Sequence, residues 1–300
     1  MVWLEIRVLE YFLAVAREQS ISAAAASLHL SQPTLSTQLK GLEEELGKQL
    51  LVRGTKGSRR VTLTEEGMLL RKRAEEILSL VRRTEQEIAQ PEEAVAGEVF
   101  IAAGETEAFR LVARTVRRLR LSCPEVRVHI ASGNATFVLE QLERGLIDFG
   151  ILYGAVDRTR YEAMELPLRD QFGVLMRRDA PLAERPFITP EELRDKPLIL
   201  SRQEERDGWP ILSWLGREIS QLTIAATYTL IYNASLLVDE GVGYAVCFDH
   251  LVHTEGTGLT FKPLSPPLEA GASVVWKKYQ SFSRAAGRFL EELRREKERG

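Results

Sequence analysis

Residues 31–47 read SQPTLSTQLKGLEEELG, a stretch that carries signals for both the start and the end of a helix. Ser31 is a favoured cap at the start of a helix, and Gly47 is a favoured residue just beyond its end. The spacing therefore predicts a helix from Ser31 to about Leu46. On a helical wheel, four leucines fall within one narrow stripe and polar residues occupy the opposite side. The stripe is Leu35, Leu39, Leu42 and Leu46, and the opposite side is Pro33, Ser36, Thr37 and Lys40. One face packs against a core, and the other stays free for a partner.

Two shorter helical segments precede this helix. Residues 4–17 place five apolar side chains on one helical face, which predicts an amphipathic first helix. Ser22 can cap a second helix from Ala23 to Leu28, whose alanines let another helix approach closely. His29 and Leu30 then turn the chain, so the three segments predict a helix-turn-helix.

A basic hairpin is expected directly after the third helix. Residues 49–67 read QLLVRGTKGSRRVTLTEEG and predict two short strands, Leu50 to Arg53 and Arg59 to Leu63, joined by a Gly-rich turn. The formal net charge of the whole chain is −3, which argues against a uniformly basic nucleic-acid surface. The positive charge is instead local, at the place where a wing would touch a phosphate backbone.

The third helix and the hairpin together suggest a DNA-binding surface. A helix fits the major groove, and the residues at its N-terminal end reach base edges: Gln32 can hydrogen-bond adenine, whereas Lys40 suits a phosphate. The predicted DNA contacts are Ser31, Gln32, Pro33, Thr34, Ser36, Thr37, Lys40, Arg53, Lys56, Arg59 and Arg60. From periodicity alone, the polar face could equally be the solvated side of a core helix. The two preceding helices, the tight turn and the basic hairpin favour DNA.

A long helix is predicted next, from Thr64 toward Gln90. Its apolar residues recur at alternating spacings of four and three, which is the pattern of a coiled-coil seam. The seam is Leu70, Ala74, Ile77, Val81, Thr84 and Ile88. A helix of about 25 residues spans about 37 Å, too long to bury its stripe against so small a domain. Pairing with a second copy, as a homodimer, is therefore expected. Residues 91–97, which contain Pro91 and two glutamates, are predicted to form a hinge.

From Glu98 onward, strand-like stretches alternate with helical ones, which predicts a parallel sheet with helical crossovers. The strand-like stretches are VFIAA, VRVHIA, FGILY, FGVLM, PLILS, LTIAAT, GYAVC and ASVVWKK, with helices near 109–121, 137–144, 209–220, 230–240 and 281–298. About 200 residues are many for one compact sheet, so two subdomains with a cleft between them are expected. Subdomain I is assigned to residues 98–166 and 267–300, and subdomain II to residues 167–266.

The sequence resembles the LysR-type transcriptional regulators. The resemblance is carried by Phe12, Ala24, Ala25, Leu28, Ser31, Gln32, Pro33, Leu35, Ser36, Leu39, Leu42, Glu43, Leu46, Gly47, Leu50, Arg53, Leu63, Thr64, Glu66 and Gly67, with weaker matches at Gly97, Pro124, Gly145 and Asp148. Thr37 and Leu51 depart from it, because many relatives carry a basic residue and a phenylalanine at these positions.

The resemblance implies an α+β, multi-domain chain. A winged helix-turn-helix over residues 1–63 is followed by a dimerising linker helix over 64–90, the hinge, and an effector domain over 98–300. The two subdomains of that domain are expected to be similar to periplasmic binding proteins. The resemblance also implies a homotetramer assembled from dimers on double-stranded operator DNA. RNA polymerase is a further partner if the chain activates transcription.

A small-molecule effector is expected in the cleft. In parallel sheets, ligands lie at the carboxyl ends of strands, beside helix N-termini whose free N–H groups favour anions. The predicted contacts are Glu105, Thr106, Asn134, Ala135, Thr136, Ser201, Arg202, Gln203 and Thr229, of which Thr106, residues 134–136 and residues 201–203 follow from the resemblance. A hydroxyl at a helix start is also an ordinary cap. Glu105 and Glu107 count against a strongly anionic ligand unless Arg202 offsets them, and the effector's identity stays open.

Catalytic and metal-binding functions find little support in the sequence. Cys123 and Cys247 form no CxxC pair and are expected to be buried small hydrophobic residues. The four histidines lack metal spacing; only His250 and His253 could share a helix face, and no site is expected there. The sequence contains no P-loop and no GxSxG elbow. We therefore expect neither enzymatic activity nor a cofactor.

The expected location is the cytoplasm, without membrane association. The sequence shows no signal peptide and no run of the roughly 20 apolar residues that a bilayer span needs. The alternatives are a solute-binding receptor or an enzyme on the same α/β scaffold. A receptor would ordinarily be exported, and an enzyme would need a nucleophile, base or metal set.

Overall fold

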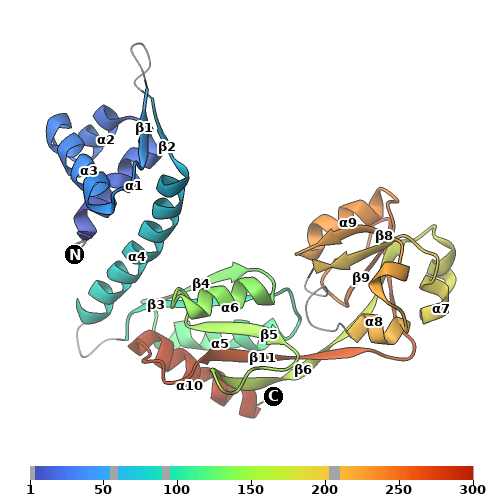
Figure 1. The fold of residues 1–300 in the computed structure, drawn as a ribbon. Coiled ribbons are helices and arrows are strands. Elements are labelled where there is room, and N and C mark those ends of the chain that lie inside the picture. Colours follow the sequence, from blue (N-terminus) through green and yellow to red (C-terminus); the bar gives the residue numbers. More distant parts are fainter. Residues whose placement is uncertain (1–3, 55–59, 90–94, 203–209, 300) are drawn as a thin grey trace. The chain divides into compact units, whose positions relative to one another are not determined.

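The computed structural model describes residues 4–54, 60–89, 95–202 and 210–299, apart from the side chains of Gln86 and Glu87. The chain divides into two compact units, Met1–Ala89 and Gln90–Gly300, which can be followed by colour in Figure 1. No helix within the described ranges is both long enough and apolar enough to cross a membrane.

The first unit consists of helices and a two-stranded hairpin. Its elements are α1 (Ile6–Glu18), α2 (Ile21–Ser27), α3 (Gln32–Leu46), β1 (Leu51–Arg53), β2 (Val61–Leu63) and α4 (Glu65–Ala89). Phe12 is fully buried in a core to which α1, α2, α3 and both strands contribute. The three N-terminal helices and the hairpin predicted from the sequence are therefore present around one core.

Both ends of α3 lie where the sequence predicts. The hydroxyl of Ser31 accepts a hydrogen bond from the Thr34 N–H at 3.3 Å, which satisfies one of the free donors at the helix start. Gly47 ends the helix in the left-handed conformation, with φ 63°. These two local signals fix the boundaries of the helix without help from the rest of the fold.

The predicted start of α2 is wrong by two residues. Ser20 rather than Ser22 is the cap: its hydroxyl accepts the Ala23 N–H at 3.3 Å, and the helix begins at Ile21. Gln19 adopts a left-handed conformation at the end of α1, with φ 50°, which leaves Ser20 extended and available as a cap.

A carboxylate ties the hairpin to α3. Glu43 Oε1 accepts the N–H groups of Leu50 and Leu51, at 2.8 and 2.9 Å. The strands are antiparallel, with Leu51 opposite Leu63. The strand predicted from Arg59 begins at Val61 in the structure. Because bonds to a charged acceptor are stronger than neutral ones, Glu43 fixes the position of the hairpin relative to α3.

The apolar stripe of α4 is only partly buried within its own unit. Ala74 and Leu78 are buried against Leu9 of α1, and Leu70 and Ile77 pack at the edge of this cluster. Further along the helix, Leu80 and Ile88 are 38 % and 80 % exposed. The first part of the predicted seam thus packs inside the unit, and the second part faces outward.

The second unit is an α/β structure. Its elements are β3 (Gly97–Ala103), α5 (Phe109–Ser122), β4 (Val126–Ser132), α6 (Ala135–Glu143), β5 (Phe149–Tyr153), β6 (Tyr161–Arg177), the 3-10 turn η1 (Pro181–Glu184), α7 (Pro190–Leu193), β7 (Leu198–Ser201), α8 (Pro210–Leu215), the 3-10 turn η3 (Ile219–Gln221), β8 (Ile224–Tyr228), α9 (Ile231–Asp239), β9 (Tyr244–Phe248), β10 (Leu259–Pro263), β11 (Glu269–Lys277) and α10 (Arg284–Arg299).

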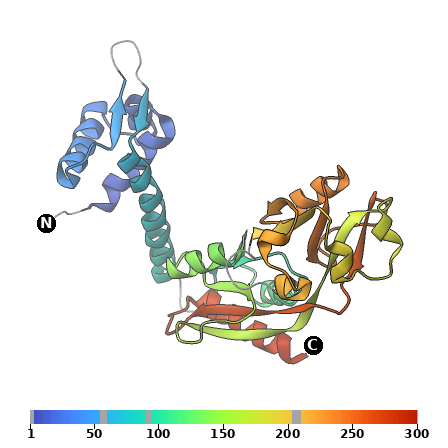
Figure 2. The ribbon, with the colours of Figure 1, turned by 45° about the vertical axis from the view of Figure 1, so that its right-hand side comes forward.

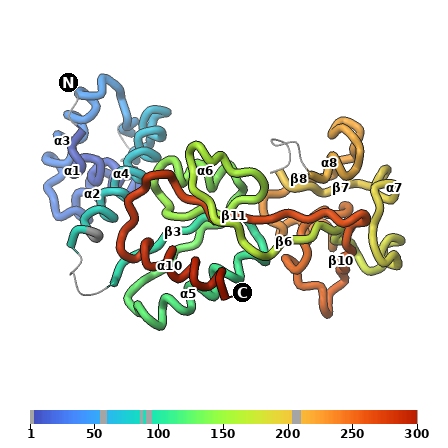
Figure 3. Tube along the Cα trace, turned by 90° about the horizontal axis from the view of Figure 1, so that it is seen from below, coloured from blue at the N-terminus to red at the C-terminus, as the bar shows by residue number. Residues whose placement is uncertain are grey.

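The strands follow the order β4-β3-β5-β11-β6-β9-β7-β8, with β10 added to β6. β3 lies parallel to β4 and β5, and β7 lies parallel to β8 and β9, as the alternating pattern predicts. The prediction of a parallel sheet is wrong for β6 and β11, which are antiparallel to each other and to their other neighbours because they connect the two halves instead of following helical crossovers. They run side by side from one half of the unit to the other, as Figure 3 shows.

Each half of this unit has its own core. In subdomain I, α5 and α10 cover one face of the sheet and α6 covers the other. In subdomain II, α7 and α8 cover one face and α9 covers the other. Figure 2 shows the two halves on either side of the connecting strands. Cys123 and Cys247 are both buried, which confirms their predicted role as core residues.

The sequence pattern missed the first part of β6. Only residues 172–176 are predicted as a strand, whereas the strand begins at Tyr161. Pro167 and several charged residues disfavour a strand in this stretch. Pro167 is tolerated because it lies opposite an irregular register between Gly271 and Ser273 of β11, where the ladder does not need its missing N–H. β10 is a further strand that the pattern did not predict.

Two helical predictions in subdomain II need correction. The helix expected over residues 209–220 is the short α8, because Gly216 turns left-handed with φ 62° and ends it. His250 and His253 do not share a helix face. His250 lies in a turn with a φ of 61°, and His253 lies in irregular structure outside any helix.

Candidate DNA interface and effector cleft

The free face of α3 carries the predicted DNA contacts. Leu35, Leu39 and Leu42 are buried, which confirms the predicted packing face. On the other side, Ser31, Gln32, Pro33, Thr34, Thr37 and Lys40 are exposed and Ser36 is half-buried. The polar surface is thus open at the N-terminal end of the helix, where side chains can reach the base edges of a major groove.

Some polar side chains of α3 already have partners within the helix. The Ser31 hydroxyl caps the helix and lies 2.7 Å from the Thr34 hydroxyl. Lys40 lies 3.4 Å from Glu44, an exposed pair of small energetic value that a phosphate can replace. Gln32 and Thr37 are also exposed and take part in neither of these contacts.

Two arginines of the hairpin contact residues of the helical part of this unit. Arg53 lies 3.9 Å from Glu43 of α3, and the Arg60 Nε donates to Gln19 Oε1 at 3.0 Å. Lys56 and Arg59, which are also predicted DNA contacts, lie outside the described residues. The described part of the hairpin thus carries two cationic side chains, of which Arg53 contacts α3 and Arg60 contacts the residue that follows α1.

A second candidate site is a cleft of about 1020 Å³ in the second unit. Five predicted effector residues line it: Glu105, Ala135 and Thr136 from subdomain I, and Ser201 and Thr229 from subdomain II. They follow the carboxyl ends of β3, β4, β7 and β8. Ligand sites in parallel sheets are expected at such strand ends. The cleft therefore lies where the strand pattern places it.

Other predicted effector residues have different surroundings. Thr106 is buried, and its hydroxyl donates to Asp170 at 2.6 Å. The Asn134 side chain caps α6 by accepting the Phe137 N–H at 3.0 Å. The side chains of Thr106 and Asn134 are thus engaged in hydrogen bonds within the protein, which is the structural alternative that the sequence left open for a residue at a helix start. Arg202 is exposed and not part of the described lining, and Gln203 lies outside the described residues.

Asp170 is an important residue that the sequence analysis missed. It is buried on β6 and accepts hydrogen bonds from the Thr106 hydroxyl at 2.6 Å, the Tyr153 hydroxyl at 2.8 Å and the Glu107 N–H at 3.0 Å. Burial, and then the charge of Asp170, raise the pKa of Tyr153, so its phenol stays a donor. Tyr153 also lines the cleft, and its ring lies 4.7 Å from that of Phe248. Asp170 therefore links the connecting strand to the cleft wall.

A hydrogen bond between distant segments crosses the cleft within the described residues. Glu105, in the loop after β3, accepts the N–H of Ile231, the first residue of α9, at 2.6 Å. The two residues are 126 positions apart in the sequence. No local sequence signal could have predicted this pair, because it depends on how the subdomains face each other.

Comparison with known proteins identifies both units. Residues 6–68 match the model of the bacterial regulatory helix-turn-helix proteins of the lysR family, and residues 92–298 match the LysR substrate binding domain. The chain belongs to the LysR family. As a LysR regulator it is a DNA-binding transcriptional regulator with an effector-binding domain, and not an enzyme.

Individual LysR proteins are similar along most of the chain. The uncharacterized HTH-type transcriptional regulator YfeR of Shigella flexneri is 28% identical over 93% of this chain and 89% of its own length. The HTH-type transcriptional regulator AlsR of Bacillus subtilis is 31% identical over 92% of this chain and 85% of its own. A crystal structure of full-length CbnR complexed with its target DNA superposes with a TM-score of 0.76, covering 98% of this chain and 100% of that one, at 22% identity. The last comparison shows that the LysR fold is shared.

Proposed function

We propose that two copies of this regulator bind operator DNA through α3, and that a small molecule in the cleft changes how they engage it. The observation that carries the DNA contact is the division of α3 into a buried leucine face and an open polar face. The comparisons do not favour the alternatives, a solute-binding receptor and an enzyme, because the similar proteins are transcriptional regulators.

The DNA contacts divide into two kinds. Gln32, Thr37 and the adjacent Pro33 and Thr34 are proposed to meet base edges, because they lie at the open N-terminal end of α3. Lys40, Arg53 and Arg60 are proposed to contact phosphates, together with Lys56 and Arg59. Phosphate contacts fix the orientation of the protein on the duplex, and base contacts select the sequence.

Replacing Gln32 with alanine is expected to relax sequence choice. An amide that pairs with adenine contributes about 1–3 kcal/mol of discrimination, so the preference for the cognate base should fall by about 5- to 150-fold. The measurement is a competition gel shift between an operator fragment and versions with single base changes. Gln38→Ala is the matched control, since Gln38 is the same residue type on the same helix but partly buried toward the leucine side. Unchanged discrimination in Gln32→Ala would place the base-reading surface elsewhere.

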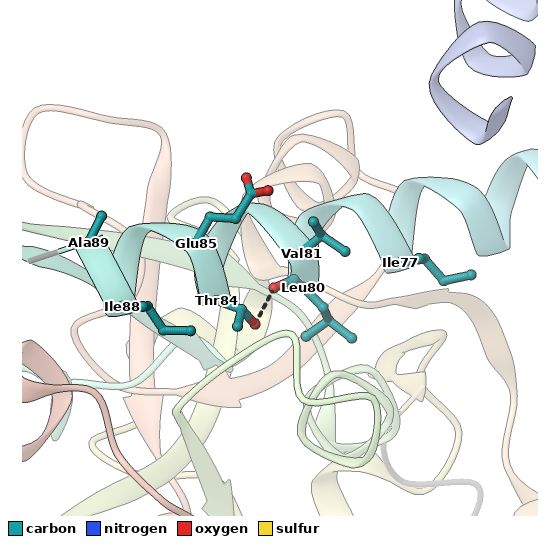
Figure 4. Close-up of a pocket in the computed structure, with 7 residues that line it drawn as sticks. All are labelled: Ile77, Leu80, Val81, Thr84, Glu85, Ile88 and Ala89. Atoms are coloured by element: carbon teal, nitrogen blue, oxygen red, sulfur yellow. Dashed lines mark hydrogen bonds between the residues drawn. The ribbon is translucent and has the colours of Figure 1, made fainter. Parts of the chain in front are cut away.

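The outward part of α4 is proposed to pair two copies. A groove on this helix is lined by Ile77, Leu80, Val81, Thr84, Glu85, Ile88 and Ala89. Figure 4 shows that Ile77, Leu80, Thr84 and Ile88 point to the same side of the helix, and that the Thr84 hydroxyl bonds to the Leu80 carbonyl of its own helix at 2.9 Å. Thr84 therefore needs no polar partner in an apolar interface. A homodimer built on this face, assembling further into a tetramer, presents two recognition helices to one operator.

The cleft is proposed as the effector site, with Glu105, Ala135, Thr136, Ser201 and Thr229 as contacts. It lies between two halves joined by the paired strands β6 and β11, so a ligand that touches both halves can change their relative position. The effector is proposed to alter the DNA footprint by this route, and RNA polymerase is a further partner if the regulator activates transcription. Footprints on genomic fragments with and without candidate metabolites test this; a footprint that no metabolite alters contradicts it.

A further inference from the structure

We propose that the cleft takes an uncharged or cationic small molecule and rejects carboxylates and phosphates. This inference rests on the proposed function of the cleft as the effector site. Its basis is that side-chain oxygen atoms of the chain already accept an amide at the helix starts where an anion would bind, and that each arginine lining the described cleft has a carboxylate partner.

The start of α9 is occupied by Glu105. Leu230, at the N-cap of α9, has no side-chain acceptor, so the first amide of the helix lacks a local partner. Glu105 Oε2 accepts this amide, the Ile231 N–H, at 2.6 Å from across the cleft. A carboxylate of the protein thus sits at the positive end of the helix, where the carboxylate of a ligand would otherwise be stabilised.

The starts of α6 and α5 are occupied in a similar way. Asn134 Oδ1 accepts the Phe137 N–H at 3.0 Å and so caps α6. Asp170 Oδ1 accepts the Glu107 N–H at 3.0 Å, just before α5. An anionic ligand that approaches one of these helix starts meets an oxygen atom that already accepts an amide there. Displacing that oxygen leaves a charged or polar side chain without its partner, which costs free energy.

The charged side chains of the lining do not favour an anion either. Within the described lining, five carboxylates face three guanidinium groups, and each guanidinium lies within 4.0 Å of one of those carboxylates. The pairs are Arg160 with Glu143 at 2.9 Å, Arg169 with Glu269 at 3.2 Å, and Arg144 with Glu140 at 3.9 Å. The remaining carboxylates, Glu105 and Asp157, accept hydrogen bonds from N–H or O–H groups. The lining therefore carries an excess of negative charge.

The pair formed by Arg160 and Glu143 is held in its charged form. A hydrogen bond from the Tyr161 hydroxyl lowers the pKa of Glu143, so this carboxylate is ionised at neutral pH. Burial, and then Glu143 itself, raise the pKa of Tyr161 to about 12, so the phenol remains the donor. Arg160 thus keeps a negative partner throughout the physiological pH range.

Aromatic side chains give the cleft a surface suited to an apolar or cationic group. Tyr153, Phe172 and Phe248 all line it, and the Phe248 ring lies 4.7 Å from Tyr153 and 4.4 Å from Phe172. Aromatic faces attract cations. Arg202, the residue that could have offset the acidic loop at Glu105, is exposed and not among the described lining residues. The balance of contacts thus favours ligands without a negative charge.

Three probes that share one phenyl group test this selectivity: phenylacetate, phenylacetamide and phenethylamine. Their affinities for the full chain are measured by calorimetry or ligand-observed NMR. The wild type should bind phenethylamine and phenylacetamide at least tenfold more tightly than phenylacetate. Glu105→Ala should bind phenylacetate at least tenfold more tightly than the wild type, because it frees the α9 amide and removes a like charge. Glu107→Ala is the matched control, since Glu107 pairs with Arg110 outside the described lining.

If the wild type binds phenylacetate as tightly as the other probes, the proposed ligand class is wrong. The cleft would still stand as the proposed effector site. The proposed ligand class would also be overturned if Glu105→Ala binds phenylacetate no more tightly than the wild type while another probe binds. If none of the probes binds the wild type or Glu105→Ala, the result counts against the cleft as the effector site itself. Glu105→Gln, which removes the charge and keeps an acceptor for Ile231, replaces the alanine variant if circular dichroism shows that the latter is misfolded.

Discussion

The double substitution Leu80→Asp and Ile88→Asp is expected to abolish the proposed pairing of two copies through α4 and to weaken operator binding by about 10²- to 10⁴-fold. The factor is the avidity lost when two linked recognition helices no longer bind two half-sites together. Both side chains are exposed within the unit, at 38 % and 80 %, so their replacement should not disturb its fold. In a dimer, however, four aspartates would be brought together in an apolar interface.

Sedimentation equilibrium and a gel shift with a two-half-site operator measure the two effects. The control is Ser79→Asp with Arg82→Asp, because both residues are exposed and lie outside the apolar groove of α4. This control adds at least as much negative charge, so a general repulsion from DNA would weaken it equally. If the substitutions at Leu80 and Ile88 leave both the molecular mass of the assembly and the operator affinity unchanged, the copies pair through a different surface.

Asp170→Ala is expected to lower the free energy of unfolding of the effector-binding unit by about 3–5 kcal/mol. The carboxylate is 3 % exposed and accepts three hydrogen bonds. Removing it leaves the hydroxyls of Thr106 and Tyr153 and the Glu107 amide without their acceptor, at about 1–3 kcal/mol for each buried group. Because Asp170 lies on β6, the loss should also loosen the junction between the subdomains.

Urea unfolding, followed by circular dichroism, measures this change. Asp157→Ala is the matched control, since Asp157 is exposed and accepts its hydrogen bonds from the nearby Thr159. Its substitution should alter stability by less than about 1 kcal/mol. Equal effects of the two alanine variants would mean that the bonds to Asp170 contribute little to the stability of the unit.

The DNA-binding helix could be predicted because its signals are local. Ser31, Gly47 and the leucine spacing lie within one stretch, and caps and periodicity act over a few residues. The start of α2 was missed because Ser20 and Ser22 are both capable caps. The choice between them depends on where Gln19 ends α1, which the sequence pattern does not encode.

The seam of α4 could be predicted only in part. Its period is visible in the sequence, but which side chains α1 covers is a matter of tertiary packing. Ala74 and Leu70 are used inside the unit, whereas Leu80, which is outside the predicted seam, lines the outward groove. A helical period shows that an apolar stripe must pack against something. It does not show whether the partner is another helix of the same unit or a second copy of the chain.

The sequence predicted where the cleft lies, at the ends of the parallel strands. It did not predict the hydrogen bonds between the side chains around it. Glu105, Thr136 and Thr229 line it because the ends of parallel strands meet at one edge of a sheet. Asp170 was missed because its three donors come from residues 17 to 64 positions away. Pro167 obscured the strand that carries Asp170. Such long-range pairs become visible only when the sheet is assembled.

Methylation interference on a bound genomic fragment tests the placement of α3 most directly. A methyl group on guanine N7 lies in the major groove, and one on adenine N3 lies in the minor groove. If α3 lies in the major groove, N7 methylation will block binding at two sites separated by one or more helical turns, about 10–10.5 base pairs each. Interference confined to adenine N3, or binding indifferent to N7 methylation, would contradict major-groove recognition by α3.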